Sequence, residues 1–276
     1  MKKLIVVADW AADSVNCQEV RTAVEGNLKQ PDPTPNITFV SSTPSSIHTA
    51  FIMQQLIEVE QRYGRPADTV MFQNTDPRLQ TKEGVLEAKG ADFIVVRLQT
   101  GMYVCGPNAG YDFSLIKDLI EEVFVYRQLD KGSQFRSRDM YARACAHLMD
   151  NMEDDMDLEQ ADLGIIPDLK GHFVAHTDSY GNIKTTMKLE DMKGKVEIGE
   201  QIHVTINGVT KEVTYTSNLF GAGVGKLVIY PGSSGPKSNP YMEITTWTHF
   251  GDGDSKTGVH HFNLPHPGQE IKLGST

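Results

Sequence analysis

The stretch Leu4-Ile5-Val6-Val7-Ala8-Asp9-Trp10 decides how the first part of the chain folds. Its unbroken apolar run, rich in β-branched residues, is typical of a strand that is buried on both faces of a sheet. The run stops at Asp9, so the strand places a carboxylate in the loop that follows it. Because ligands of open α/β sheets bind beside the carboxyl ends of the strands, Asp9 is a candidate site residue. Capping of the next helix is the alternative role for this side chain.

Further short apolar runs are separated by segments with helical periodicity. The runs lie at residues 37–40, 69–72, 93–96 and 102–105. We expect one helix from Asp13-Ser14 to about Leu28, a second with Ile52, Leu56, Val59 and Tyr63 on its packing face, and a third after the cap Ser114. This alternation predicts an α/β N-terminal domain with a largely parallel sheet through about residue 150.

Polar loops follow two of the later strands. One is Asn74-Thr75-Asp76-Pro77-Arg78, where a carboxylate again stands just beyond a strand. The other is Gly106-Pro107-Asn108-Ala109-Gly110, whose amide can bind polar edges of a ligand. A plain turn is the alternative reading of Asp76-Pro77.

The character of the chain changes after an acidic segment at residues 150–162, which we interpret as the approach to a linker. Beyond Gly171 the chain consists of short β-rich runs between Gly, Asn, Asp and Pro, and Asn207-Gly208 is typical of a type I′ hairpin turn. These features predict a small all-β, barrel-like C-terminal domain. We therefore place the domains at residues 1–165 and 166–276.

The composition excludes several classes of partner. The 276 residues include 26 Lys and Arg against 36 Asp and Glu, a formal net charge of -10, which argues against nucleic acid or an anionic membrane as the main partner. Three cysteines without CxxC spacing indicate neither a disulfide framework nor a zinc site, and we expect no metal. With no long apolar stretch, the protein is expected to be cytoplasmic.

The stretch Gln134-Phe135-Arg136-Ser137-Arg138-Asp139 places two arginines, a hydroxyl and a carboxylate at a helix start, where free N–H groups favour anionic ligands. The helix would bury a stripe of Met140 or Tyr141, Ala144, Cys145 and Leu148. A capped helix with an exposed Arg–Asp pair is the alternative interpretation.

Five short segments, in this order along the chain, resemble motifs of one enzyme family. They are residues 8–15 (ADWAADSV), Asp76-Pro77, residues 107–110 (PNAG), residues 135–139 (FRSRD) and residues 177–183 (TDSYGNI). The family is that of the S-adenosylmethionine hydroxide adenosyltransferases and the related fluorinase and chlorinase, which join an α/β domain to a β-barrel domain. The resemblance implies displacement at the 5′ carbon of S-adenosylmethionine, with methionine leaving and adenosine or a 5′-halo-adenosine forming. It implies no cofactor beyond this substrate, and a homotrimer with sites between subunits.

The resemblance also implies roles for individual residues. Asp9 would hold the ribose hydroxyls and Asp13 the methionine ammonium, with Asn108 as a further substrate-binding residue. From the second domain, Tyr180 would stack on the adenine and Asn182 would bind it by hydrogen bonding, with Asp178 in the same motif. Ser137 falls where the halogenases hold their halide. For Ser137 an N-cap, and for Asn182 a turn position, are the alternatives.

The chain also departs from the family pattern. The hydroxide-using members activate water with an Asp, an Arg and a His; here Asp76 is present, but Arg136 stands at the His position and Arg78-Leu79-Gln80 replace the glycines. Because a carboxylate repels halide and can act as a base for water, we expect hydrolysis, with Asp76 orienting or deprotonating the water and Arg136 stabilising the developing hydroxide. A halide-using adenosyltransferase and a non-catalytic binder of S-adenosylmethionine or adenosine remain as alternatives.

Overall fold

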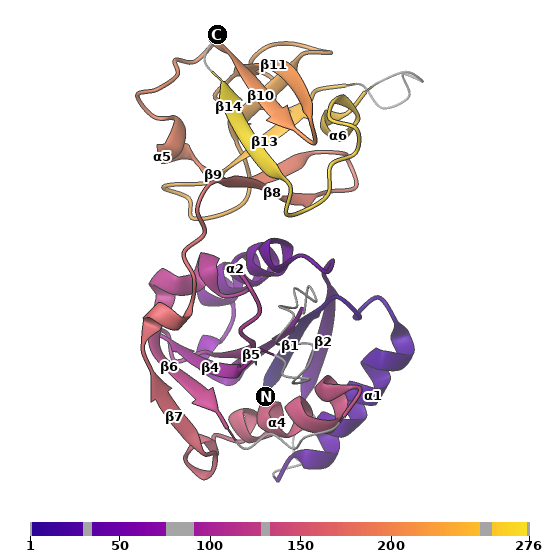
Figure 1. Ribbon diagram of the computed structural model, residues 1–276, viewed down its shortest axis with the longest axis vertical. Coiled ribbons are helices and arrows are strands. Elements are labelled where there is room, and N and C mark those ends of the chain that lie inside the picture. The colour runs from indigo at the N-terminus through magenta and orange to yellow at the C-terminus, as the bar shows by residue number, and fades with distance from the viewer. Residues whose placement is uncertain (1, 30–34, 76–90, 128–132, 249–255, 275–276) are drawn as a thin grey trace, which may run out of the picture. The chain divides into compact units, whose positions relative to one another are not determined.

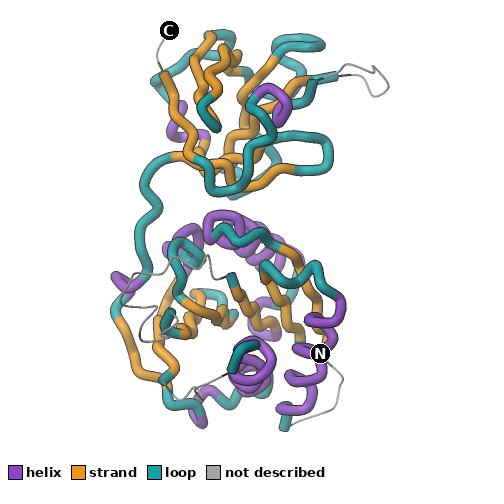
Figure 2. The backbone as a smooth tube through the Cα atoms, turned by 45° about the vertical axis from the view of Figure 1, so that its right-hand side comes forward, coloured by secondary structure: helices purple, strands orange, loops and turns teal. Residues whose placement is uncertain are grey.

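The computed structural model describes residues 2–29, 35–75, 91–127, 133–248 and 256–274. The chain divides into two compact units, Met1–Leu169 and Lys170–Thr276, so the division falls at 169/170 where the sequence indicated 165/166. Helices flank strands in the first unit, whereas the second consists mainly of strands and loops with short helical turns (Figure 2).

The first unit contains a seven-stranded mixed sheet in the order β2-β1-β3-β5-β4-β6-β7 (Figure 1). The strands are β1 Lys3–Ala8, β2 Asn36–Ser41, β3 Thr69–Asn74, β4 Phe93–Leu98, β5 Tyr103–Pro107, β6 Ile120–Tyr126 and β7 Leu158–Ala161. β2, β1, β3 and β5 are parallel neighbours, whereas β5–β4, β4–β6 and β6–β7 pair antiparallel. The expectation of a largely parallel sheet is therefore right for the first half of the sheet and wrong for the second.

Local features explain the antiparallel half. A tight turn joins β4 to β5: Gly101 has a φ of 81°, and the Leu98 N–H donates to the Met102 carbonyl at 2.9 Å. Such a connection needs no helical crossover. The helix predicted after Ser114 is only a 3₁₀ turn, Ser114–Leu119, and β6 follows it directly. From Glu122 to Val125 the burial alternates with the period of a strand.

Helices cover both faces of the sheet, which explains why β1 is apolar from Leu4 to Ala8 (Figure 1). Leu4, Val6 and Ala8 pack in the core shared with α1 (Ser14–Asn27) and α4 (Ala142–Met149). Ile5 and Val7 pack on the opposite side, in the core shared with α2 (Ser46–Tyr63). Burial of both faces removes the alternation of polar and apolar residues that a one-sided sheet shows.

The two predicted helical stripes differ in outcome. In α4, the predicted residues Ala144, Cys145 and Leu148 are buried. In α2 the predicted face is wrong in its last turns, because Val59 is 55% and Tyr63 76% exposed. The buried face of α2 instead includes Ile47, Ala50, Phe51, Met53 and Ile57.

The acidic segment at residues 150–162 is part of the first unit. Asp150 is buried, where its carboxylate accepts from Lys2 Nζ at 3.1 Å and from the Lys29 N–H at 2.6 Å. Strand β7 lies within the segment and forms the edge of the sheet beside β6. A 3₁₀ turn, Leu163–Ile165, follows it.

The second unit is a closed barrel with the strand order β10-β11-β12-β13-β9-β8-β14. Its strands are β8 His172–Thr177, β9 Ile183–Lys188, β10 Gln201–Ile206, β11 Val209–Tyr215, β12 Leu227–Pro231, β13 Tyr241–Thr246 and β14 Glu270–Gly274, with short helices α5 Leu189–Met192 and α6 Gly258–His261. The β10–β11 hairpin turns at Asn207-Gly208, where φ is 51° and 72°, as a type I′ turn requires. The predicted barrel and its hairpin are confirmed.

Among the described helices, none has the length and apolar character that a membrane crossing requires.

Candidate functional site

The order β2-β1-β3 creates a switch point in the sheet of the first unit. From β1 the chain crosses through α1 to β2 on one side, and from β2 it crosses through α2 to β3 on the other side of β1. The strands end together, because Ala8 is paired with both Ser41 and Asn74. Connections that leave a parallel sheet in opposite directions open a crevice at this edge, where ligands of such folds bind.

Asp9 stands directly at this switch point. It follows the last residue of β1, and its N–H donates to the Asn74 carbonyl at 3.4 Å. The residue is half-buried. The expected placement of a carboxylate beyond β1 is therefore observed.

Asp13, four residues further, caps α1. Its Oδ1 accepts from the Val15 N–H at 2.8 Å and from the Asn16 N–H at 3.3 Å. The side chain is exposed, and it joins the loop after β1 to the start of the helix. Its role toward a ligand ammonium remains a prediction, made for a carboxylate that also serves as an N-cap.

Ser137 lies on a π-helical turn, Ser137–Tyr141, that leads into α4. π-Turns insert an extra residue into a helix and often occur at functional sites. Ser137 is fully buried, and its Oγ accepts a hydrogen bond from Asn74 Nδ2. The turn therefore brings the 134–139 stretch to the carboxyl end of β3, which the sequence did not predict.

Arg136 and Arg138 have different surroundings. The Arg136 guanidinium lies 6.0 Å from the centre of the Tyr141 ring. Arg138 is bonded to Asp139 at 2.5 Å and to Glu19 at 3.1 Å, in an ion cluster on the surface. The alternative reading of an exposed Arg–Asp pair is thus correct for Arg138 and Asp139, whereas Ser137 beside them is buried.

An aromatic contact joins two of the motif segments. The Trp10 ring meets Phe135 edge-on at 5.5 Å between centroids and lies 6.2 Å from Phe39. The loop after β1 and the 134–139 stretch are therefore packed against each other. Trp10 Nε1 is buried without a hydrogen-bond partner among the described residues.

A group of buried hydroxyls at the same edge was not singled out from the sequence. Thr75 Oγ1 lies 2.6 Å from Thr49 Oγ1 and 3.1 Å from Ser42 Oγ, and the Thr75 N–H donates to the side-chain amide oxygen of Gln73 at 3.1 Å. Gly106 on β5 permits this packing, since a Cβ there would lie 2.2 Å from the Gln73 carbonyl. The position of Thr75 just beyond the end of β3 is the sequence signal that could have identified it.

Asn108 follows β5 at the same sheet edge. Its Nδ2 donates to the Ile165 carbonyl at 2.9 Å, so the amide holds the 3₁₀ turn after β7. Its Oδ1 is buried and has no partner within the described part of the chain. One end of this amide is therefore structural, and the other retains an acceptor.

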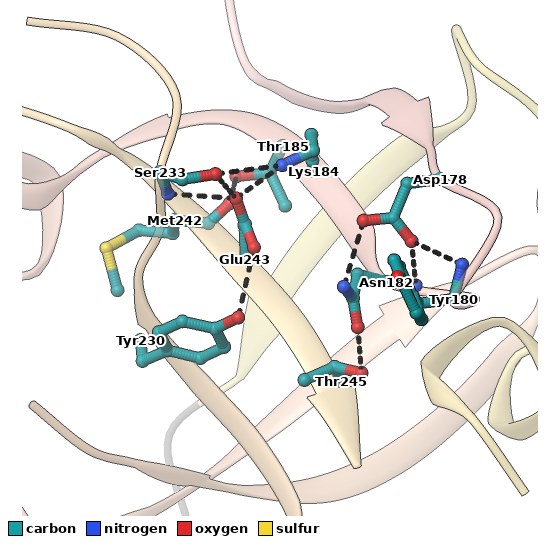
Figure 3. A network of polar contacts seen from close by, with 10 residues as sticks. All are labelled: Asp178, Tyr180, Asn182, Lys184, Thr185, Tyr230, Ser233, Met242, Glu243 and Thr245. Atoms are coloured by element: carbon teal, nitrogen blue, oxygen red, sulfur yellow. Dashed lines mark hydrogen bonds and ion pairs between the residues drawn. The ribbon is translucent and has the colours of Figure 1, made fainter. Parts of the chain in front are cut away.

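In the barrel, the three predicted residues form one network (Figure 3). Asp178 accepts from the N–H groups of Tyr180 and Asn182, both at 3.0 Å, and from Asn182 Nδ2 at 2.9 Å. Thr245 Oγ1 donates to Asn182 Oδ1 at 2.5 Å. The Tyr180 side chain is 60% exposed. The turn at Gly181, where φ is 77°, brings these groups together, as the turn interpretation of Asn182 also required.

A buried ion pair lies beside this network (Figure 3). Lys184 Nζ contacts Glu243 Oε1 at 2.7 Å, and Tyr230 donates to Glu243 Oε2 at 3.0 Å. Burial, followed by the Glu243 charge, raises the pKa of Tyr230. Burial and the nearby Lys184 lower the pKa of His176. Sequence reasoning missed this pair because the partners lie on strands far apart in the chain.

Two further expectations concern the proposed base and metals. Asp76, the proposed base, lies outside the described residues. Within the described ranges, no group of three or more His, Cys, Asp or Glu side chains is placed to hold a metal ion.

No protein-family model matches the chain, and no curated protein matches it either. Two solved structures share its fold over nearly the whole length. One is an uncharacterized conserved protein from Thermotoga maritima, with a TM-score of 0.67, 17% identity, and coverage of 98% of this chain and 100% of the other. The second is a conserved hypothetical protein from Thermus thermophilus, with a TM-score of 0.61, 16% identity, and coverage of 99% and 100%. At these identities the likeness concerns the fold alone.

Proposed function

We propose that the protein is an S-adenosylmethionine hydrolase that forms adenosine and methionine. The observation that supports this most is the meeting of two motif-like segments, residues 8–15 and 135–139, at one sheet edge. Asn74, the last residue of β3, accepts from the Asp9 N–H through its backbone carbonyl and donates to Ser137 through its side-chain amide. Segments that resemble adenosyltransferase motifs are thus neighbours at the switch point, where ligands bind in this kind of sheet.

The chemistry suits such a site. The water oxygen forms a bond to the ribose 5′ carbon while the C–S bond breaks and its electron pair stays with the methionine sulfur. A sulfonium is already a good leaving group, so the protein has to align the reactants and keep bulk water away rather than supply an acid. The water proton passes to Asp76, and Arg136 stabilises the developing hydroxide.

The remaining residues bind the substrate. Asp9 accepts from the ribose hydroxyls, and Asp13 receives the methionine ammonium. Asn108 presents its buried Oδ1 as a further polar contact. Tyr180 and Asn182, with Asp178 beside them, bind the adenine by stacking and hydrogen bonding. No cofactor takes part, and the active form is a homotrimer with sites at subunit interfaces.

Ser137 favours one second candidate, a halide-using adenosyltransferase. Its hydroxyl is buried and accepts from Asn74, so the hydroxyl proton can be donated to an anion. Against this stands Asp76, whose charge would repel a halide in the same pocket.

The deciding experiment incubates the purified protein with S-adenosylmethionine in ¹⁸O-labelled water, with and without chloride, and separates the products by chromatography with mass detection. Hydrolysis predicts adenosine labelled at the 5′ oxygen in both samples. A chloride-dependent 5′-chloro product would select the second candidate. Binding without any product would contradict both and leave a ligand-binding protein.

Asp76→Ala tests the proposed base within the same assay. Because the carboxylate acts on water rather than on substrate binding, turnover should be lost while the dissociation constant for S-adenosylmethionine, measured by calorimetry, stays within about threefold. Unchanged turnover would exclude Asp76 as the base. Asp68→Ala, at a 3₁₀ turn before β3, is the control and should leave turnover as in the wild type.

A further inference from the structure

Asn74 lies outside the five motif-like segments, so the family resemblance gives it no role. It is the last residue of β3, paired with Ala8 at the switch point. Its carbonyl accepts from the Asp9 N–H, and its side-chain amide donates to Ser137 Oγ. One residue thereby connects the loop after β1 to the π-turn before α4.

The direction of the bond to Ser137 decides what the hydroxyl can do. A serine hydroxyl has one proton to donate and two lone pairs that accept. Asn74 Nδ2 donates, so it occupies a lone pair and leaves the proton available. Ser137 is fully buried, and Asn74 is the partner that its Oγ has within the described ranges. Bulk water therefore does not compete for the proton.

We propose that Asn74 is a positioning residue that makes the Ser137 hydroxyl a donor toward the nucleophile. This inference rests on the proposed function, because it assumes a nucleophile beside Ser137. A water oxygen and a halide both carry lone pairs that accept such a proton. The hydroxyl holds the nucleophile in place but does not deprotonate it, so Ser137 and the proposed base have separate tasks.

The amide of Asn74 cannot be replaced by a carboxylate on this account. An ionised carboxylate only accepts hydrogen bonds. The Ser137 hydroxyl would therefore donate its hydrogen bond to the carboxylate and turn away from the nucleophile. A protonated carboxyl would donate again and restore the original direction. In Asn74→Asp, the orientation of the Ser137 hydroxyl, and with it the activity, should therefore depend on pH.

The first test compares Asn74→Asp with the wild type over a range of pH. Near pH 8, kcat should fall by roughly 100-fold, as when one preorganised donor is lost from an active site, while KM stays within about threefold. Activity of the variant relative to the wild type should recover as the pH falls through the pKa of the introduced carboxyl. Asn36→Asp, an exposed amide at the first residue of β2, is the matched control and should show the wild-type profile.

The second test is a double-mutant cycle with Asn74→Ala and Ser137→Ala. If Asn74 acts through Ser137, Asn74→Ala reduces kcat in the wild-type background and has no further effect on Ser137→Ala. Circular dichroism and urea unfolding establish that each variant is folded before it is assayed.

Two outcomes overturn the role of Asn74 while leaving the reaction in place: wild-type turnover and pH profile for Asn74→Asp, or additive losses in the double variant. A folded wild-type protein that forms no product contradicts the proposed function itself and overturns the inference with it. The wild-type assay therefore separates the two failures.

Discussion

Asn74 in the α/β unit and Asn182 in the barrel use the same amide group in opposite ways. The side-chain amide of Asn74 donates to the Ser137 hydroxyl, and its backbone carbonyl accepts from the Asp9 N–H in the loop after β1. Asn182 is held at both ends of its side chain, by Asp178 at Nδ2 and by Thr245 at Oδ1. Because a carboxylate can only accept, Asp178 also determines which end of the Asn182 amide is the nitrogen.

Asn74 thus orients a neighbouring hydroxyl, whereas Asn182 is itself oriented by its neighbours. In the α/β unit, the Ser137 hydroxyl keeps its proton to donate to a ligand. In the barrel, the amide keeps one N–H and one lone pair, in an orientation that its neighbours determine. A buried ion pair, Lys184–Glu243, also lies beside the barrel network.

The largest effect is expected from breaking that ion pair. Lys184→Met leaves the Glu243 carboxylate buried without its cation, so the free energy of unfolding of the barrel should fall by about 3–5 kcal/mol. Urea unfolding of the full chain measures it. Lys184→Met combined with Glu243→Leu should recover most of the loss.

The exposed pair Lys272–Glu270 provides the matched control. Lys272→Met should change stability by less than about 1 kcal/mol. A loss as small for Lys184→Met would show that the barrel network is no more structural than a surface pair, and the contrast with the α/β edge would weaken.

Ser137→Ala tests the ligand-directed side of the comparison. Removal of a buried donor from the nucleophile should lower kcat by about 10²–10³-fold, with little change in KM. Ser133→Ala serves as the control, because Ser133 Oγ donates to Asp139 at 2.6 Å on the same stretch and touches no proposed ligand group. Equal effects of the two substitutions on kcat would argue against a specific role for Ser137.

Thr245→Val tests the other amide with a smaller expected effect. The Asn182 Oδ1 loses its donor and the amide gains freedom to turn, which should raise KM for S-adenosylmethionine by about five- to tenfold, or roughly 1 kcal/mol, with kcat within twofold. Thr246→Val is the control, since Thr246 Oγ1 is buried without a partner in the described part of the chain. An unchanged KM for Thr245→Val would indicate that Asp178 alone orients the amide.

The smallest effect is expected at the exposed neighbours of Ser137. Hydrogen bonds from Arg138 and then Ser133 lower the pKa of Asp139 to about 2, below the value of about 4 for an unfolded chain. A depressed pKa contributes stability that is present above about pH 4 and disappears as the pH falls through about 2. The stability difference between the wild type and Asp139→Asn should therefore shrink over this range, as measured by urea midpoints. A difference that grows toward pH 2 would contradict the assignment.

The sequence predicted the fold best where periodicity and packing agree. The buried runs at residues 4–8 and 69–72 became strands, and the hairpin at Asn207-Gly208 followed from turn chemistry. Prediction was wrong for the helix after Ser114, because the apolar spacing from Ile116 to Val123 fits either a helix or a short turn followed by a strand. That ambiguity also concealed the antiparallel half of the sheet.

The candidate site was predictable only in part. Asp9 was predicted to lie where a parallel strand ends, and that rule depends on the fold alone. The bond from Asn74 to Ser137 spans 63 positions and exists because α4 packs on the sheet, and the Lys184–Glu243 pair spans 59. Neither contact follows from local spacing, since each requires the three-dimensional register of separate elements.

Closure of the barrel by β14 has a consequence for protein synthesis. β14 fills the gap between β8, the first strand of the barrel, and β10, so both keep an unpaired edge until residues 270–274 have left the ribosome. The α/β unit has all of its strands by Ala161 and can complete its sheet earlier. Growing chains therefore carry a complete first unit while the barrel strands β8 and β10 still have unpaired edges. A premature stop just before Glu270 would leave those edges exposed for pairing with other chains.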